Sequence, residues 1–412
     1  MPALRAFLVV AVGALLLLLL LRGVADAQFN GDFEVGRRAL SDENYLDWKA
    51  YQFPIMWRYE WYTARNALRA SVGSLTNRRF YMLHDIKLQA DLGQMVSFLY
   101  LQDSESFGRD DGIYQEAELR VGDGVYGSLL GWVAPEKRFD NVGVALSYGG
   151  REDQNLLRVS YLRQFAEYNE RSTAVASSEG RYARTPDLYR IEARTFWNER
   201  LFLSLHLTQE SPAEFEEAET GITRRYEGEE VNAVLDWWGA ERDWLAGASL
   251  WGDRERRSQS TATPSETAPA LQQRMEWYAW EVYGWRRLAG GDHLTFGLAD
   301  SGFSNHISSG QSSERFRFAM TTTQLFTRWE PGASESPHWL FSVQAGQVDS
   351  RQFNARDPAS NRDETSLQAK GGTGLVVQET GRHRFLFLAT WDLDSFYRRP
   401  WDGGSVQLQI VF

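Results

Sequence analysis

Apolar and polar residues alternate with a period of two along most of the chain after residue 80. In the clearest stretch, every second residue from Leu201 to Leu207 is leucine, with Ser204 and His206 between them. This period places one class of residue on each face of a β-strand. Counting such runs from Phe80 gives 17 strands, and a weaker run at about 66–75 makes 18. One misassigned hairpin would leave 16, which stays the alternative.

The connections between these runs alternate in length. The short ones, for example 122–124, 198–200 and 239–243, are rich in the Gly, Asp and Asn residues that tight hairpins need. The other connections are longer and polar, chiefly 167–186, 210–222, 253–274 and 349–369. With an even number of strands, both chain ends and all short turns lie on one side of the sheet. Short turns on one side and longer loops on the other are typical of outer-membrane barrels.

Each predicted strand has one apolar face, and the architecture must shield all of these faces from water. A soluble propeller would show a repeat of about 40 residues, and none is present. Lipid cannot satisfy the backbone groups of an open sheet edge, so a membrane sheet must close on itself. We therefore predict an all-β protein that folds as a transmembrane, antiparallel, up-and-down β-barrel of about 18 strands.

Composition agrees with a barrel whose outer face is apolar and whose inner face is polar. Aromatic residues make up 14% of the chain, including 16 Trp, although the mean hydropathy is −0.45. The net charge of −11 argues against a nucleic-acid partner, which would require a basic surface. The chain has no Cys and no HExxH motif, so no metal or other cofactor is expected.

The first 27 residues have the features of a cleaved signal peptide. Arg5 precedes an apolar run of 15 residues, and Ala25 and Ala27 supply the small residues that signal peptidase requires. The run is shorter than the roughly 20 residues of a membrane helix. We expect 1–27 to be the signal peptide, 28–56 a periplasmic N-terminal segment, and 57–412 the barrel. Whether 28–56 is a tail, a helix or a plug in the lumen stays open.

The last strand carries a second indication of the outer membrane. Val406, Leu408, Ile410 and Phe412 share one face, and the final residue is aromatic. This resembles the terminal strand of outer-membrane proteins, in which residues such as Leu408, Ile410 and Phe412 form the signal that the barrel-assembly machinery reads. The mature chain as a whole resembles the porin and outer-membrane channel superfamily. The resemblance implies a location in the outer membrane, among its lipid and lipopolysaccharide.

A barrel of 16 to 18 strands is too wide for its side chains to fill, so inward-facing charges are the candidate functional residues. Strand parity puts eight basic and seven acidic residues inward, Arg158 and Asp236 among them. We expect the pore to be lined by Glu116, Glu118, Arg120, Arg190, Glu192, Arg194, Arg315 and Arg317. The near balance of charge argues against a conduit for a polyanion and favours passive diffusion of small hydrophilic solutes.

Other functions are weighed against this one. The alternative is a non-conducting barrel that acts as a scaffold, or as a conduit for a secreted polymer or a partner protein. Ser204 and His206 share a face, but the sequence shows no third orienting group and no oxyanion site, so we do not expect an enzyme. Six aromatic residues near strand ends are expected to lie at the level of the lipid headgroups: Trp237, Trp238, Trp277, Trp280, Tyr283 and Trp285. The solute and the choice between monomer and homo-oligomer stay open.

Overall fold

The computed structural model describes residues 55–412, apart from gaps at 76–78, 108–109, 132–141, 151, 164–179, 185–186, 218–221, 262–270, 310–313, 356, 380–382 and 399. The predicted signal peptide and residues 28–54 lie outside the described residues. The predicted loop at 167–186 lies mostly outside them as well.

The described chain is one antiparallel sheet with little helix. Its elements in order are α3 (Ile55–Thr63), β1 (Ala67–Leu75), β2 (Arg79–Asp91), β3 (Val96–Phe107), β4 (Asp110–Asp123), β5 (Val125–Gly131), β6 (Val142–Tyr148), β7 (Leu156–Arg163), β8 (Gly180–Arg184), β9 (Asp187–Trp197), β10 (Leu201–Glu217), β11 (Ile222–Trp238), β12 (Trp244–Thr261), β13 (Leu271–Arg287), β14 (His293–Ser309), β15 (Glu314–Glu330), β16 (His338–Asn354), η4 (Pro358–Ser360), β17 (Arg362–Glu379), β18 (His383–Asp392) and β19 (Trp401–Val411).

The sheet closes into a barrel of 18 strands, which confirms the predicted fold and strand number. Strands β8 and β9 both pair with β10, so they are two pieces of one strand. The weak run near residue 66 is strand β1, and it pairs with β2 on one side and with β19 on the other. The seam between β1 and β19 runs in register from Ala67↔Val411 to Ser74↔Gly404. With its two ends paired, the sheet leaves no open edge to lipid.

The two faces of the strands differ as the sequence pattern predicts. On β6, Val142, Val144 and Leu146 are 52–64% exposed, whereas Ala145 and Ser147, which have the opposite parity, are buried. The exposed apolar residues form the outer, lipid-facing surface, and the buried small and polar residues face inward. An apolar exterior on a closed barrel of this size is the architecture of an outer-membrane protein. In the described part of the chain, no helix has the length and apolar character needed to span a membrane.

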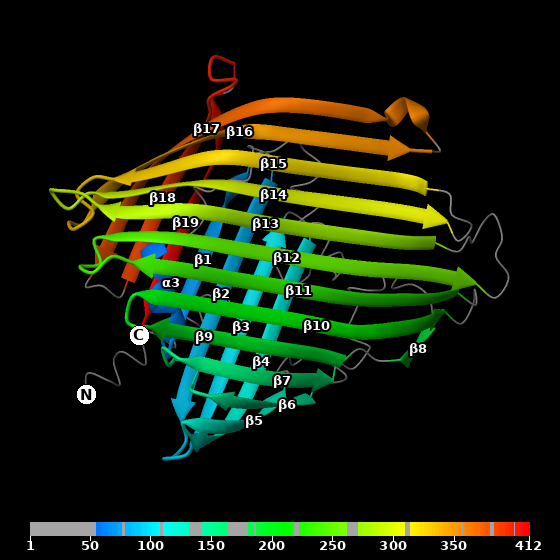
Figure 1. Cartoon of the computed structure of the whole chain (residues 1–412), viewed down its shortest axis with the longest axis horizontal. Helices are drawn as coiled ribbons and strands as arrows, with labels where there is room; N and C mark the ends of the chain where they lie inside the picture. The colour runs from blue at the N-terminus through cyan, green and yellow to red at the C-terminus, as the bar shows by residue number, and fades with distance from the viewer. Residues whose placement is uncertain are drawn as a thin grey trace.

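The strands β10–β17 run side by side and extend further at one end than β4–β9 do (Figure 1). Predicted connections 210–222, 253–274 and 349–369 are mostly strand in the structure, because these hairpins continue into polar sequence. Pairs such as Arg256 with Glu227, 3.1 Å apart, join neighbouring strands there without an apolar face. The sequence pattern missed these extensions because charged residues occupy both faces.

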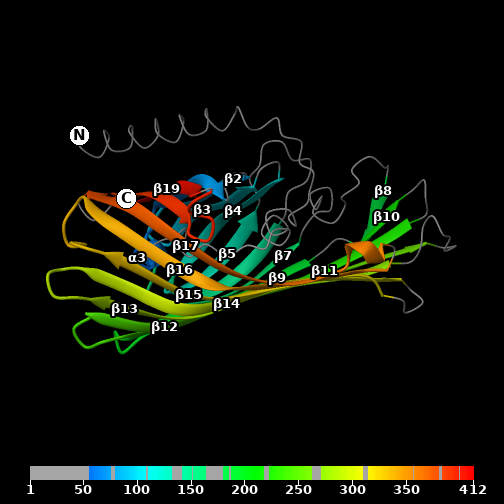
Figure 2. The ribbon, with the colours of Figure 1, turned by 90° about the horizontal axis from the view of Figure 1, so that it is seen from above.

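The C-terminal strand β19 and helix α3 meet at the end of the barrel that carries the short turns (Figure 2). Val406 is exposed on the outer face, whereas Gln407 and Gln409 are buried on the inner face. The backbone N–H of Phe412 donates to the carbonyl of Asn66 over 3.0 Å, which fastens the last residue to the start of β1. That Leu408, Ile410 and Phe412 act as the assembly signal stays a prediction. The barrel boundary expected at residue 57 falls inside α3, and the first strand begins at Ala67.

The closing seam gives a direct test, because the chain contains no cysteine of its own. Val72 and Val406 are register partners across the seam, so a Val72→Cys, Val406→Cys variant should form a disulfide on oxidation. The measurement is a mobility shift in unheated gels that reductant reverses. Val72→Cys with Ile410→Cys is the matched control, since its cysteines lie about four residues, roughly 13 Å, out of register. A barrel with a different seam would crosslink the control as readily.

Candidate pore and its inner wall

A charged cluster on β4, β7 and β9 occupies the inner face of the barrel. The Arg158 guanidinium lies 3.4 Å from Glu116, 3.2 Å from Glu118 and 3.0 Å from Glu192. The Arg190 guanidinium lies 2.8 Å from the second oxygen of Glu116. We call these five residues the charged wall. The structure thus brings four of the predicted pore residues together around Arg158; that they line a conducting pore stays a prediction.

Arg158 of β7 reaches Glu116 and Glu118 of β4 because the two strands between them carry small side chains. Two strands, β5 and β6, separate β7 from β4, and their inner faces carry Ser128, Ala145 and Ser147. Ser128 also donates its hydroxyl to Glu118. A larger residue at Ala145 or Ser147 would fill the space that the long arginine side chain crosses. The contact therefore depends on register across four strands, which no local sequence pattern specifies.

Two further arginines of the predicted pore set, Arg120 and Arg194, bind the turn between β6 and β7. The Arg120 guanidinium lies 3.0 Å from Glu152, and Arg194 donates to the carbonyl of Asp153 over 2.7 Å. Burial would raise the pKa of Glu152, but hydrogen bonds from Arg120 and Gln89 outweigh it and lower the pKa to about 2. Glu152 therefore stays charged at any physiological pH, and the turn is held against the inner wall by an ion pair.

Arg317 lies on the outer face, against the prediction that it lines the pore. It shares the parity of Leu325, which is 65% exposed, and β15 has a regular register between them. The prediction assumed that the apolar residues of this strand face lipid. Instead Phe318 and Met320 face inward and pack with Val348, so Arg317, between them and Phe316, faces outward. The register of β14 with β15 is irregular next to Arg315, whose side chain lies outside the described set.

Helix α3 crosses the lumen at the end with the short turns. On one side Glu60 is paired with Arg384 of β18, and Gln409 of β19 donates to the Trp57 carbonyl over 3.0 Å. On the other side the Tyr59 hydroxyl donates to Asp236 of β11. Between β10 and β19, eight strands lie on each side of the barrel when β8 and β9 count as one. The contacts of α3 are therefore on nearly opposite walls.

Aromatic packing anchors the same helix. The ring of Tyr59 lies 5.3 Å from those of Phe202 and Trp238, and Tyr62 stacks on Phe202 at 5.5 Å. Lys87 of β2 donates to the carbonyl of Tyr62, near the C-terminal end of the helix, over 3.3 Å. Burial raises the pKa of Glu60 above its usual value, although Arg384 opposes this. Sequence analysis missed the helix; the one available signal was a run of aromatics without a period of two.

Four of the aromatics expected in the headgroup zone face inward instead. Trp238, Tyr283 and Trp285 form a buried cluster around Tyr59, and Trp277 packs against Phe303. The headgroup-level prediction is wrong for these four. Trp237 is 59% exposed on the outer face beside a short turn, as expected. Neighbouring residues in a strand point to opposite faces, so a strand with aromatics on both faces does not reveal which face meets lipid.

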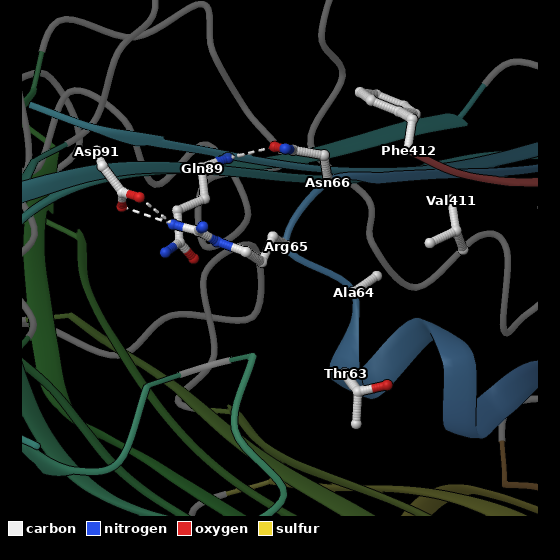
Figure 3. A pocket seen from close by; sticks show the side chains of 8 residues that line it. All are labelled: Thr63, Ala64, Arg65, Asn66, Gln89, Asp91, Val411 and Phe412. Carbon is white, nitrogen blue, oxygen red and sulfur yellow. Dashed lines mark hydrogen bonds and ion pairs between the residues drawn. The ribbon is translucent and has the colours of Figure 1, made fainter.

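A cavity of about 370 Å³ opens where the chain closes on itself (Figure 3). It is lined by Thr63, Ala64, Arg65, Asn66, Gln89, Asp91, Val411 and Phe412. Arg65 binds both carboxylate oxygens of Asp91 at 2.6 Å, and the Gln89 backbone N–H donates to the Asn66 side chain over 2.7 Å. These contacts tie the segment after α3 to β2. The cavity is thus part of the closing seam and lies apart from the charged wall.

Catalytic and metal-binding arrangements were also considered. Ser204 and His206 share the inner face of β10, and His206 Nε2 lies 3.0 Å from Thr208 Oγ1. Among the described residues, no group of three His, Asp or Glu side chains is placed to hold a metal ion. The candidate site is therefore the charged wall together with α3.

Comparison with known proteins finds structural likeness only. No protein-family model matches the chain, and neither does any curated protein sequence. A bacterial polysaccharide outer-membrane secretin aligns over 85% of this chain and 99% of its own, with 11% identity and a TM-score of 0.38. Pseudomonas aeruginosa OccK2 (OpdF) aligns over 84% and 96%, with 16% identity and a TM-score of 0.36. Vibrio cholerae OmpT in its trimer form aligns over 84% and 98%, with 8% identity and a TM-score of 0.36. These low values leave the function to be inferred from the chain's own residues.

Arg158 should be important for stability because three carboxylates surround it. Arg158→Met would leave the buried Glu116 and Glu118 and the half-buried Glu192 without their shared cation, at a cost of about 3–5 kcal/mol. The measurement is urea unfolding of the lipid-reconstituted barrel at pH 7, followed by tryptophan fluorescence. Arg163→Met, an exposed arginine on the same strand, is the matched control and should change stability by about 0.5 kcal/mol or less. Equal effects of the two substitutions would contradict the central role of Arg158.

Proposed function

We propose that this protein is an outer-membrane channel through which small hydrophilic solutes diffuse passively. The observation that carries the proposal is the charged wall inside a closed barrel of 18 strands. A barrel this wide leaves more room than its side chains fill. Fixed charges at the inner surface then act on passing solutes through their field and their hydrogen bonds.

The signs of the charges favour a weakly selective pore. The charged wall has three carboxylates and two guanidinium groups, and both signs lie within 3.4 Å of each other. Such a surface offers partners to solutes of either charge and holds neither strongly. A conduit for a polyanion would need mainly cations along its inner surface. The mixed charges of the charged wall therefore argue against a polyanionic polymer as cargo.

Helix α3 would narrow the periplasmic exit of this channel. It lies across the lumen at the end of the short turns, where its contacts reach both β18–β19 and β9–β11. A solute that passes the charged wall would have to pass beside this helix. The diffusion limit of the channel would then be set by α3 as well as by the wall.

The crossing helix also favours a second candidate, a barrel that does not conduct. If α3 closes the exit fully, the protein would serve as a membrane scaffold. The two functions differ in the conductance of the unaltered mature chain, which is silent in the scaffold and shows unitary steps in the channel.

Arg190 offers a test of the channel. The mature chain in planar bilayers should show stable unitary steps, and Arg190→Ala should shift the ion preference toward cations, because it leaves Glu116 less compensated. Reversal potentials in a salt gradient measure the preference. Arg286→Ala, an exposed residue at the far end of β13, is the control and should leave it unchanged. Absence of steps from both the mature chain and a chain without α3 would refute the channel.

Loosening α3 should enlarge the exit. A Tyr59→Phe, Glu60→Gln variant loses the hydrogen bond to Asp236 and the ion pair with Arg384, so its unitary conductance should exceed that of the unaltered chain. Tyr62→Phe, on the same helix, keeps its aromatic stacking and should conduct like the unaltered chain. Single-channel recording of all three measures the effect. Equal conductance in the double variant would show that α3 does not limit the exit.

A further inference from the structure

Strand β17 is longer than its neighbour β18 and continues past it on the side of the long loops. The ladder between the two strands runs from Lys370↔Asp392 to Glu379↔His383. These 10 residues of β18 match the length of a tilted strand that crosses the apolar layer. The rest of β17, residues 362–369, therefore lies beyond the membrane, where β16 pairs with its other side. We call residues 362–369 the β17 edge, which lies at the border of the sheet in Figure 1.

Backbone groups of this edge point to the side that β18 leaves empty. Just past the end of β18, the carboxylate of Asp394 accepts the N–H of Ala369 over 2.8 Å. Every second residue of a strand directs its backbone groups to the same side. The N–H and C=O groups of Asp363, Thr365 and Leu367 therefore point the same way as those of Ala369. Among the described residues, no strand pairs with these three on that side.

The β17 edge lacks the features that usually protect an exposed strand. It contains no proline, and its register with β16 has no bulge. Charged residues occupy only its far end, at 362–364, so the part from Thr365 to Ala369 is uncharged. Leu367 is 78% exposed beside the unpaired backbone groups. A straight, uncharged edge of this kind is a template for pairing with another chain.

We propose that the β17 edge binds an extended polypeptide segment of a partner outside the cell, which adds to the sheet as a further β-strand. Backbone donors and acceptors that repeat roughly every 7 Å along a line match the backbone of another strand. Because Thr365–Ala369 carries no charge, the segment opposite it is uncharged, and Leu367 gives it an apolar contact. Binding at this edge does not depend on conduction through the lumen.

A second copy of this chain does not fit the edge. Two copies in one membrane, related by a two-fold axis along the membrane normal, would bring their β17 strands together at an angle. With each strand tilted by about 40°, the two would cross at about 80°, whereas neighbouring strands of a sheet differ by roughly 10–35°. Strands that cross so steeply meet at one point and form no ladder. The partner is therefore a different polypeptide.

The test uses a fluorescent cyclic β-hairpin peptide of Thr and Val, with charges only in its turns, as the probe. Fluorescence anisotropy should show that it binds the mature chain in nanodiscs. Thr365→Pro removes one N–H from the edge, at a position where a strand tolerates proline, and should weaken binding about tenfold. Thr365→Val keeps this N–H and is the matched control, which should bind as the unaltered chain does. A compact form in unheated gels shows that each variant is folded.

Two further measurements identify the mode of binding and the partner. The same peptide with N-methyl groups along its pairing edge should not bind, because it lacks the N–H donors that a ladder needs. Leu367→Cys, the only cysteine in its chain, should not link two copies by a disulfide in membranes. The proposal is overturned if the hairpin does not bind the unaltered chain, if Thr365→Pro binds it as tightly as Thr365→Val, if N-methylation changes nothing, or if Leu367→Cys links two copies.

Discussion

Hydrogen bonding of the backbone in lipid is the constraint on which the rest of this structure depends. Each N–H and C=O within the apolar layer needs a partner in the sheet, and the ladder between β1 and β19 supplies the last set. Once this seam fixes the register, every strand has one face toward lipid and one toward the lumen. The charged wall and α3 both follow from that assignment of faces.

The polar interactions described above lie on the inner surface of the barrel, away from the wall that faces lipid. Arg158 joins three carboxylates across β4–β9 because small residues on β5 and β6 clear its path. Helix α3 joins opposite walls at the end of the barrel with the short turns, because it contacts Arg384 on one wall and Asp236 on the other. Two independent sets of contacts therefore hold the inner surface, one in the wall itself and one across the lumen.

The sequence predicts the fold more completely than it predicts the candidate site. Alternation identifies strands wherever one face meets lipid, so 18 strands and the outward set Val406, Leu408 and Ile410 are readable from the chain alone. Alternation fails where both faces have the same character, as at Trp238 and Trp285, or beyond the apolar band, as at Arg317. The central position of Arg158 depends on register across β5 and β6, and the position of α3 on partners more than a hundred residues away. Neither leaves a local pattern.

The most direct measurement of the central claim is the accessibility of single spin labels along β4 in lipid vesicles. Labels at Leu119 and Val121 should collide mainly with dissolved oxygen in the lipid, whereas labels at Glu118 and Arg120 should collide mainly with a water-soluble relaxation agent. Accessibility should therefore alternate with a period of two. Equal access of the water-soluble agent to all four positions would contradict a closed barrel with a lipid-facing exterior and a polar interior.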